Sequence, residues 1–157
     1  MRIAVGADHA GFPLKAPAIE ELQRLGHDIL DFGTDSDAAV DYPDYAQAVA
    51  EAVMRGDAER GLILCGSGVG ASVVANKVPG VRGAVCHDTY SARQGVEHDD
   101  LNVLCLGARV IGIELALEIL RSWEAARFSN AERHARRLEK IKAIEAKYQQ
   151  SKEVTHG

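Results

Sequence analysis

Five short apolar runs, rich in β-branched residues, recur along this 157-residue chain, and each is followed by a segment with helical periodicity. We predict strands at 3–7, 29–32, 62–65, 83–86 and 103–106, and helices at 13–25, 44–55, 70–77, 89–97, 112–126 and 130–150. Such alternation indicates parallel strands joined by crossover helices on both faces. We therefore expect a single α/β domain over residues 1–150 with a five-stranded parallel sheet, followed by a disordered tail at 151–157.

The net charge and the cysteine content limit the functions and the cellular location that we expect for this protein. Eighteen basic and twenty-three acidic residues give a net charge of −5, which is too acidic for a nucleic-acid binder unless the basic residues cluster strongly. The three cysteines are odd in number and form no C-x-x-C pair, which favours the reducing cytoplasm. No apolar stretch has signal-peptide or membrane-spanning length. We expect neither export nor a membrane span.

Polar residues follow several of the predicted strands. Ligands of open parallel sheets bind beyond the carboxyl ends of the strands, so these positions are candidates for a site. Asp8 and His9 follow the first strand, and Arg109 follows the fifth. Asp8 and His9 could instead be a helix cap with a solvated histidine, but they share their sheet edge with the segment that follows the third strand.

That segment, Cys65-Gly66-Ser67-Gly68-Val69-Gly70, combines a thiol, a hydroxyl and three glycines at the start of a predicted helix. Glycines allow backbone N–H groups to converge on an anion, and a helix N-terminus adds positive potential. The segment is a candidate seat for phosphate or for a developing oxyanion, with a reactive thiol beside it. Cys65 is equally open to interpretation as a small buried residue that ends a strand. Cys86 and Cys105 lack the glycines, and we interpret both as packing residues.

Three other phosphate or nucleotide motifs do not match this segment. Its glycines are spaced two and two, whereas the dinucleotide fingerprint requires two and then three. A P-loop has lysine and then serine or threonine after its last glycine, but Ala71 and Ser72 follow Gly70. A cysteine-phosphatase loop has arginine at the position of Ala71. A nucleotide-dependent oxidoreductase is therefore the weakest function considered.

His98 and Asp99 precede the fifth predicted strand, so they belong at the edge of the sheet opposite Cys65. A long loop or a second subunit would have to carry them to the site, which suggests a site shared between subunits. Imidazole and carboxylate groups also ligate metals. No second histidine stands at ligand spacing from His98, and we expect no metal.

The last predicted helix carries two features on its surface. Its apolar residues form one narrow stripe on an otherwise charged rod, which predicts a partner; they are Leu138, Ile141, Ile144 and Tyr148. Arg133 and Arg137 share another face, because residues four apart are neighbours on a helix. They are either a solvated stripe paired with Glu132 and Glu139 or a phosphate site, since guanidinium groups match phosphate oxygens.

With these residues assembled, the chain resembles the ribose-5-phosphate isomerase B family, which includes allose-6-phosphate and galactose-6-phosphate isomerases. The resemblance runs from about residue 2 to residue 146 and rests on several motifs in the same order. They are Gly6-Ala7-Asp8-His9-Ala10-Gly11-Phe12, Asp41-Tyr42-Pro43-Asp44-Tyr45, Cys65-Gly66-Ser67-Gly68-Val69-Gly70, Ala75-Asn76-Lys77-Val78-Pro79-Gly80, Glu97-His98, Asn102-Val103-Leu104, Gly107-Ala108-Arg109-Val110, and Arg133-His134 with Arg137.

The resemblance implies a cytoplasmic aldose–ketose isomerase that interconverts ribose 5-phosphate and ribulose 5-phosphate without a metal or organic cofactor. It implies a three-layer α/β/α domain of flavodoxin-like or Rossmann-like type and a homodimer, sometimes a tetramer, whose sites use both subunits and whose C-terminal helix packs on the partner. Cys65 would move the proton, and Asp8, Ser67 and His98 would open the sugar ring. Substrate would be held by His9, Gly66, Gly68, Val69, Gly70, Asp99, Arg109, Arg133 and Arg137.

One departure affects the substrate more than the reaction type. Family members usually have asparagine after this histidine, whereas Asp99 replaces an amide donor with a carboxylate that only accepts hydrogen bonds. A six-carbon sugar phosphate is therefore the alternative substrate. A separate alternative, from a different class of function, is a sugar-phosphate-binding regulatory module without turnover.

Overall fold

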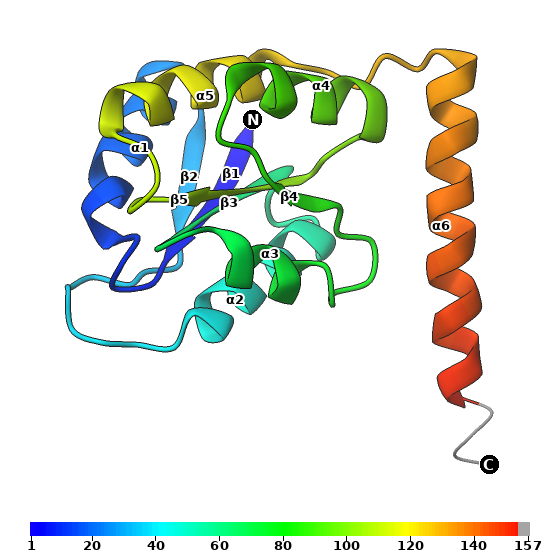
Figure 1. The fold of residues 1–157 in the computed structure, drawn as a ribbon, viewed down its shortest axis with the longest axis horizontal. Coiled ribbons are helices and arrows are strands. Elements are labelled where there is room, and N and C mark those ends of the chain that lie inside the picture. Colours follow the sequence, from blue (N-terminus) through cyan, green and yellow to red (C-terminus); the bar gives the residue numbers. More distant parts are fainter. Residues whose placement is uncertain (154–157) are drawn as a thin grey trace.

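The computed structural model describes residues 1–153, with side chains described through residue 150. A parallel sheet in the order β2-β1-β3-β5-β4 forms the centre (Figure 1). Its strands are β1 (Arg2–Ala7), β2 (Asp28–Asp31), β3 (Arg60–Cys65), β4 (Gly83–Val85) and β5 (Val103–Gly107). The predicted strands are confirmed, with small shifts at their ends.

The helices also follow the prediction, and those that cover the sheet form two layers. They are α1 (Phe12–Arg24), α2 (Tyr42–Met54), α3 (Val69–Ala75), α4 (Thr89–Asp99), α5 (Ile113–Ala125) and α6 (Glu132–Glu153). Residues of α1, α4 and α5 pack on one face of the sheet, and residues of α2 and α3 pack on the other (Figure 1). The three-layer α/β/α sandwich is confirmed.

Strand β3 shows why the two layers form. Every residue of this strand is buried, because both of its faces are covered by helices. Leu62 and Leu64 point into the core under α1 and α5, whereas Ile63 and Cys65 point into the core under α2 and α3. Successive side chains of a strand alternate between faces, so one continuous apolar run supplies both cores.

The strand order differs in one detail from the 2-1-3-4-5 order of flavodoxin. Here β5 is an inner strand and β4 forms the edge. All residues of β5 are buried, whereas the three residues of β4 are half-buried and pair with β5 alone. The longer, fully apolar strand therefore occupies the interior. The order reverses between β1 and β3, which places a ligand-binding edge at the carboxyl ends of these two strands.

Helix α6 stands beside the sandwich rather than on the sheet (Figure 1). Leu138 of its apolar stripe is buried, but Ile141 and Ile144 are 43% and 60% exposed. The helix runs to Glu153, past its expected end, and the rest of the expected disordered tail, 154–157, lies outside the described residues. Within residues 1–153, no helix combines the length and apolarity needed to cross a membrane.

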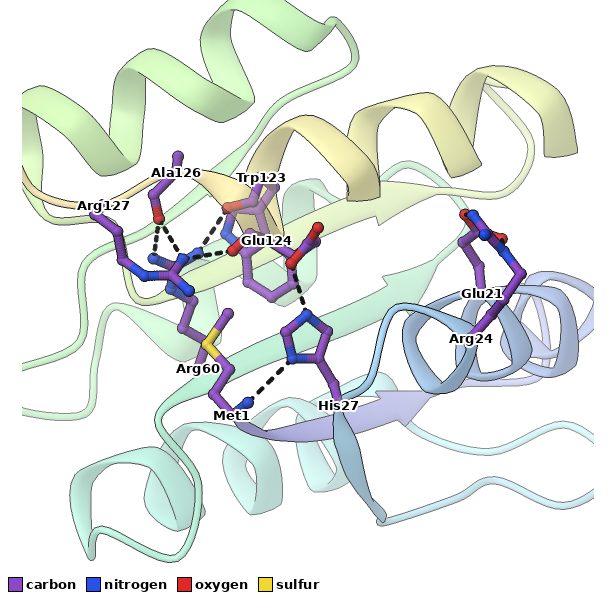
Figure 2. A network of polar contacts seen from close by, with 9 residues as sticks. All are labelled: Met1, Glu21, Arg24, His27, Arg60, Trp123, Glu124, Ala126 and Arg127. Carbon is purple, nitrogen blue, oxygen red and sulfur yellow. Dashed lines mark hydrogen bonds and ion pairs between the residues drawn. The ribbon is translucent and has the colours of Figure 1, made fainter.

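At the amino-terminal edge of the sheet, a network of polar side chains connects the strands to the end of α5 (Figure 2). Arg60, the first residue of β3, donates hydrogen bonds to the carbonyl oxygens of Trp123 and Ala126 at the end of α5, and its guanidinium lies 5.6 Å from the centroid of the Trp123 ring. Burial lowers the pKa of Arg60 to about 10. Nearby, Nε2 of His27 lies 2.6 Å from Oε2 of Glu124. These contacts join β2 and β3 to α5, at the edge opposite the predicted site.

Candidate active site

A cavity of about 390 Å³ opens at the carboxyl ends of β1 and β3, where the strand order reverses. Its volume falls within the range of sites for small molecules. It is lined by Asp8, His9, Ala10, Tyr42, Cys65, Gly66, Ser67, Gly70, Arg109 and Val110. The fold thus brings together residues that follow three different strands, as the sequence predicts for Asp8, Cys65 and Arg109.

Cys65 ends β3 and is 5% exposed. Its Sγ accepts a hydrogen bond from the backbone N–H of Gly68 at 3.0 Å. This bond turns the sulfur toward the glycine loop, and Cys65 lines the cavity. The thiol is therefore held by backbone geometry rather than by another side chain.

Two glycines allow the loop after Cys65 to cross over the end of β5. Gly68 has a φ of +82°, a conformation that side chains of L residues disfavour. A Cβ at Gly107 would lie 2.6 Å from the carbonyl carbon of Ser67, so only glycine permits this close approach. The loop consequently lies against the sheet, with Ser67 exposed above it.

Several backbone N–H groups of the loop are available to a ligand. Those of Gly66, Ser67 and Gly70 have no acceptor within the part of the chain that is described, and all three residues line the cavity. The N–H groups of Gly68 and Val69 are occupied, since they donate to Sγ of Cys65 and to Oγ of Ser67. The glycine loop therefore offers three free donors beside the thiol.

Asp8 is placed next to this loop by the turn that starts α1. Its carboxylate is buried, and Oδ1 accepts a hydrogen bond from the N–H of Gly11 at 2.9 Å. The N–H of Asp8 donates to the carbonyl oxygen of Leu64. A Cβ at Gly11 would lie 2.0 Å from that same oxygen. The absence of a side chain at Gly11 thus lets the turn press against β3 and brings Asp8 beside Cys65.

His9 is oriented by the loop that precedes α2. Its Nδ1 accepts a hydrogen bond from the backbone N–H of Val40 at 3.2 Å. When the ring is neutral, its proton must therefore be on Nε2. His9 can present an N–H group to an anion in the cavity without carrying a charge.

Tyr42, at the start of α2, also lines the cavity. Its segment carries part of the family resemblance, but the sequence predicted no role for this residue. A Cβ at Gly70 would lie 2.6 Å from Cζ of Tyr42, so the ring packs directly on the backbone of the loop. The sequence signal for this contact was Gly70, the third glycine of the loop, because a glycine permits an aromatic ring to approach the backbone.

The remaining expected residues form a second cluster away from this cavity. His98 and Asp99 end α4, and the ring of His98 stacks on His134 of α6, with centroids 3.9 Å apart. Arg133 and Arg137 flank His134 on α6 and contribute to its electrostatic environment. None of these residues lines the cavity that contains Cys65. Within a single chain, the expected site is therefore divided between two places.

The pairing of the two arginines differs from one of the two interpretations of the sequence. Glu132 forms a salt bridge with Arg136 at 2.8 Å, and Glu139 forms one with Lys142 at 3.1 Å. Within residues 1–150, neither Arg133 nor Arg137 forms a salt bridge. Both guanidinium groups are thus available to an anionic ligand.

Cys86 and Cys105 lie in the two apolar cores, which confirms their interpretation as packing residues. Burial raises the pKa of Cys86 to about 11 and also raises that of Cys105. All three cysteines are free thiols. Among the described residues, no group of three or more His, Cys, Asp or Glu side chains is arranged to hold a metal ion.

Known proteins are similar to this chain in both sequence and fold. The family model described as Ribose/Galactose Isomerase matches residues 3–141. Ribose-5-phosphate isomerase B of Escherichia coli is 45% identical over 92% of this chain and 96% of its own length. D-erythrulose-4-phosphate isomerase of Pectobacterium atrosepticum is 44% identical over 90% of this chain and 93% of its own. The solved structure of Clostridium thermocellum ribose-5-phosphate isomerase B superposes with a TM-score of 0.91 at 49% identity, covering 94% of this chain and 99% of the other.

Proposed function

Since the chain belongs to the ribose/galactose isomerase family, it is a sugar-phosphate isomerase, and we propose that it interconverts ribose 5-phosphate and ribulose 5-phosphate with Cys65 as the base. The observation that carries this proposal is the position of the thiol. Sγ of Cys65 is held by the N–H of Gly68, and the cavity that Cys65 lines is also lined by three residues whose N–H groups have no acceptor within the described part of the chain. A base beside a preorganised set of donors is what an enediolate intermediate requires.

The proposed chemistry moves one proton between neighbouring carbons. The thiolate of Cys65 removes the proton from C2 of the open-chain aldose, and the electron pair moves onto O1 to give an enediolate. The free N–H groups of Gly66, Ser67 and Gly70 stabilise the negative oxygen. A proton passes from O2 to O1, and the thiol of Cys65 then delivers its proton to C1. No electrons leave the substrate, so the reaction consumes no redox partner.

Ring opening precedes this transfer, because the furanose form has no carbonyl group to acidify the C2 proton. We assign this step to Asp8, Ser67 and His98. The phosphate group is held by cationic and N–H donors, namely His9, Arg109, Arg133 and Arg137. Arg109 approaches the loop closely, since a Cβ at Gly66 would lie 3.6 Å from its Cδ.

We further propose that the active protein is a homodimer with two shared sites. Asp8, His9, Cys65, Ser67 and Arg109 gather at one cavity, whereas His98, Asp99, Arg133 and Arg137 lie at the junction of α4 and α6. A second copy that covers the exposed side of α6 would bring its own cluster to the cavity. The free cysteines accord with a cytoplasmic location, where thiols stay reduced.

The test of the reaction is ketose formation from ribose 5-phosphate by EDTA-treated protein. We expect turnover in the wild type and a loss of about 100-fold or more in Cys65→Ala, with substrate binding retained by calorimetry. Cys86→Ala, which changes a buried thiol outside the cavity, should remain active. Absence of turnover in the wild type, with binding intact, would indicate a sugar-phosphate-binding module instead.

The substrate is tested by running other sugar phosphates in parallel. Allose 6-phosphate and galactose 6-phosphate are the six-carbon alternatives, and Asp99 is the residue that favours them. Erythrulose 4-phosphate is added because a relative of nearly equal identity is named for that substrate. If kcat/KM is highest for one of these, the substrate assignment fails while the reaction type stands. Asp99→Asn should then shift the preference toward ribose 5-phosphate.

A further inference from the structure

His98 is held from one side by its own helix. Its Nδ1 lies 2.8 Å from Nε2 of Gln94, one turn earlier in α4. An amide nitrogen donates hydrogen bonds and does not accept them, so Nδ1 of His98 is the acceptor. In the neutral ring the proton is consequently on Nε2. Gln94 thereby selects the tautomer in which His98 presents an N–H group away from its helix.

His98 is held from the other side by α6. The ring of His134 stacks on it with an interplanar angle of 26°, and His134 is only 3% exposed. Nδ1 of His134 lies 2.6 Å from Oγ of Ser129. The N–H of Ser129 donates to the carbonyl oxygen of Glu97, next to His98. The connection between α5 and α6 thus ties the two histidines together.

The charges around this stack keep His134 neutral. Burial lowers the pKa of His134, and nearby His98, Arg133 and Arg137 lower it further, while Asp99 acts in the opposite direction. Two stacked imidazolium rings would repel each other strongly at this distance. Near pH 7, His134 is therefore an uncharged packing surface for His98.

We propose that His134 is a positioning residue which, fixed by Ser129 and stacked on His98, aims Nε2–H of His98 at the ring oxygen of the cyclic sugar phosphate. The proposal rests on the proposed function, in which His98 acts in ring opening. In that step, the C1–O4 bond breaks and C1=O1 forms, the O1 hydroxyl gives its proton to the carboxylate of Asp8, and Asp8 passes that proton to O4. The Nε2–H of His98 donates a hydrogen bond that stabilises the negative charge developing on O4. A misaligned His98 slows this step and leaves proton transfer at Cys65 unaffected.

The two steps can be measured separately. The aldose ribose 5-phosphate is cyclic and needs ring opening. Ribulose 5-phosphate cannot form a five-membered ring, because its C5 oxygen carries the phosphate. Exchange of the C1 protons of ribulose 5-phosphate with solvent deuterium therefore reports proton transfer by Cys65 without the ring step. NMR follows this exchange, and a coupled assay follows ribose 5-phosphate turnover.

The variants that test the proposal each change a different contact of His98. His134→Asn removes the stacked ring, and we expect kcat for ribose 5-phosphate to fall on the order of tenfold with KM little changed. Deuterium exchange into ribulose 5-phosphate should stay within about twofold of wild type. His134→Phe keeps a stacking ring and should recover most of kcat. Gln94→Leu, which removes the hydrogen bond to Nδ1 of His98, should reproduce the selective loss through the other side of His98.

Two results would overturn the proposal. If the His134 variants lose turnover and deuterium exchange equally while remaining folded, His134 supports the structure and not the ring-opening step. If neither kcat nor exchange changes, it has no role in positioning. A wild-type protein that shows neither turnover nor deuterium exchange is a different result, because it contradicts the proposed function itself and not the role of His134.

Discussion

Arg137 and Arg136 are neighbours on α6 with different surroundings. Arg136 forms a salt bridge with Glu132, whereas Arg137 forms none within residues 1–150. A guanidinium group without a carboxylate partner can bind phosphate in a charge-assisted pair. The two residues are therefore a matched test of the phosphate assignment at the scale of single side chains.

We predict that Arg137→Ala raises KM for ribose 5-phosphate by about tenfold to a hundredfold, the loss of one charged hydrogen-bonding partner. The effect on kcat should be smaller, because the phosphate is remote from C1 and C2. Arg136→Ala removes the same charge from the next position and should leave KM nearly unchanged. Equal effects of the two substitutions, measured by initial rates, would contradict the assignment of Arg137 to phosphate.

His87 makes stability depend on pH. Its Nε2 accepts a hydrogen bond from the N–H of Gly107 at 2.8 Å, which only an unprotonated nitrogen can do. Burial lowers the pKa of His87 below its ordinary value of 6.5, with Asp88 acting in the opposite direction. Since Gly107 lies directly under Ser67, this bond supports the glycine loop.

A lowered histidine pKa means that the unfolded chain binds a proton more readily than the folded protein. The free energy of unfolding should therefore fall as pH decreases below about 6.5, and should be highest above that pH. His134, whose pKa is also lowered, contributes in the same direction. In His87→Gln, urea unfolding between pH 5 and 8 should show a flatter dependence on pH. An unchanged slope would exclude His87 as a source of the effect.

At the scale of elements, the end of α5 depends on a cation from β3. Arg60 donates to the carbonyl oxygens of Trp123, in the last turn of α5, and of Ala126, the residue that follows the helix. Arg127 donates to the carbonyl oxygen of Ala126 as well, at 2.8 Å, but it is exposed. Water can replace the contacts of the exposed Arg127 more easily than the buried contacts of Arg60.

We predict that Arg60→Leu lowers the free energy of unfolding by about 3 kcal/mol, because it leaves buried carbonyl groups without a donor. Arg127→Leu should cost less than about 1 kcal/mol, as for most exposed substitutions. Chemical denaturation of both variants provides the comparison. If the two costs were equal, burial of the Arg60 contacts would not be what stabilises this junction. Activity at 25 °C should be unaffected in either variant, since both residues lie at the edge opposite the cavity.

At the scale of the whole molecule, the division of the expected site into two clusters predicts complementation between inactive chains. A heterodimer of Cys65→Ala and His98→Ala contains one site with both substitutions and one site with neither. Random mixing should restore about one quarter of wild-type activity, since half of the dimers are mixed and each has one intact site of two.

Unfolding and refolding the two variants together, followed by the ribose 5-phosphate assay, provides this measurement. The control is the same procedure on each variant alone, which should remain inactive. If Cys65 and His98 of the same chain acted together, no mixed dimer would contain an intact site. Mixing would then restore nothing, and the shared site would be refuted.

Predictions from the sequence succeeded where the residues concerned are adjacent in the chain, and they failed where a contact joins two separate elements. Strand β3 and its loop were predictable because the apolar run, the thiol and the glycines are adjacent in the sequence. Tyr42 was missed because its contact with Gly70 joins two elements. The stacking of His98 on His134 was missed for the same reason, since it depends on how α6 returns against α4. The position of β4 outside β5 was likewise not encoded in either strand alone.

The elements, their parallel arrangement and the edge of the sheet that carries the chemistry could all be predicted from the amino-acid sequence. These follow from periodicity and from the rule that parallel strands end at the same edge, both of which are local or topological. Three contacts became known from the folded chain alone: the hydrogen bond from Gly68 to the sulfur of Cys65, the bond from Val40 that orients His9, and the stacking of His98 on His134. The physical reason is that these contacts depend on distances between elements, which packing sets and the order of residues does not reveal.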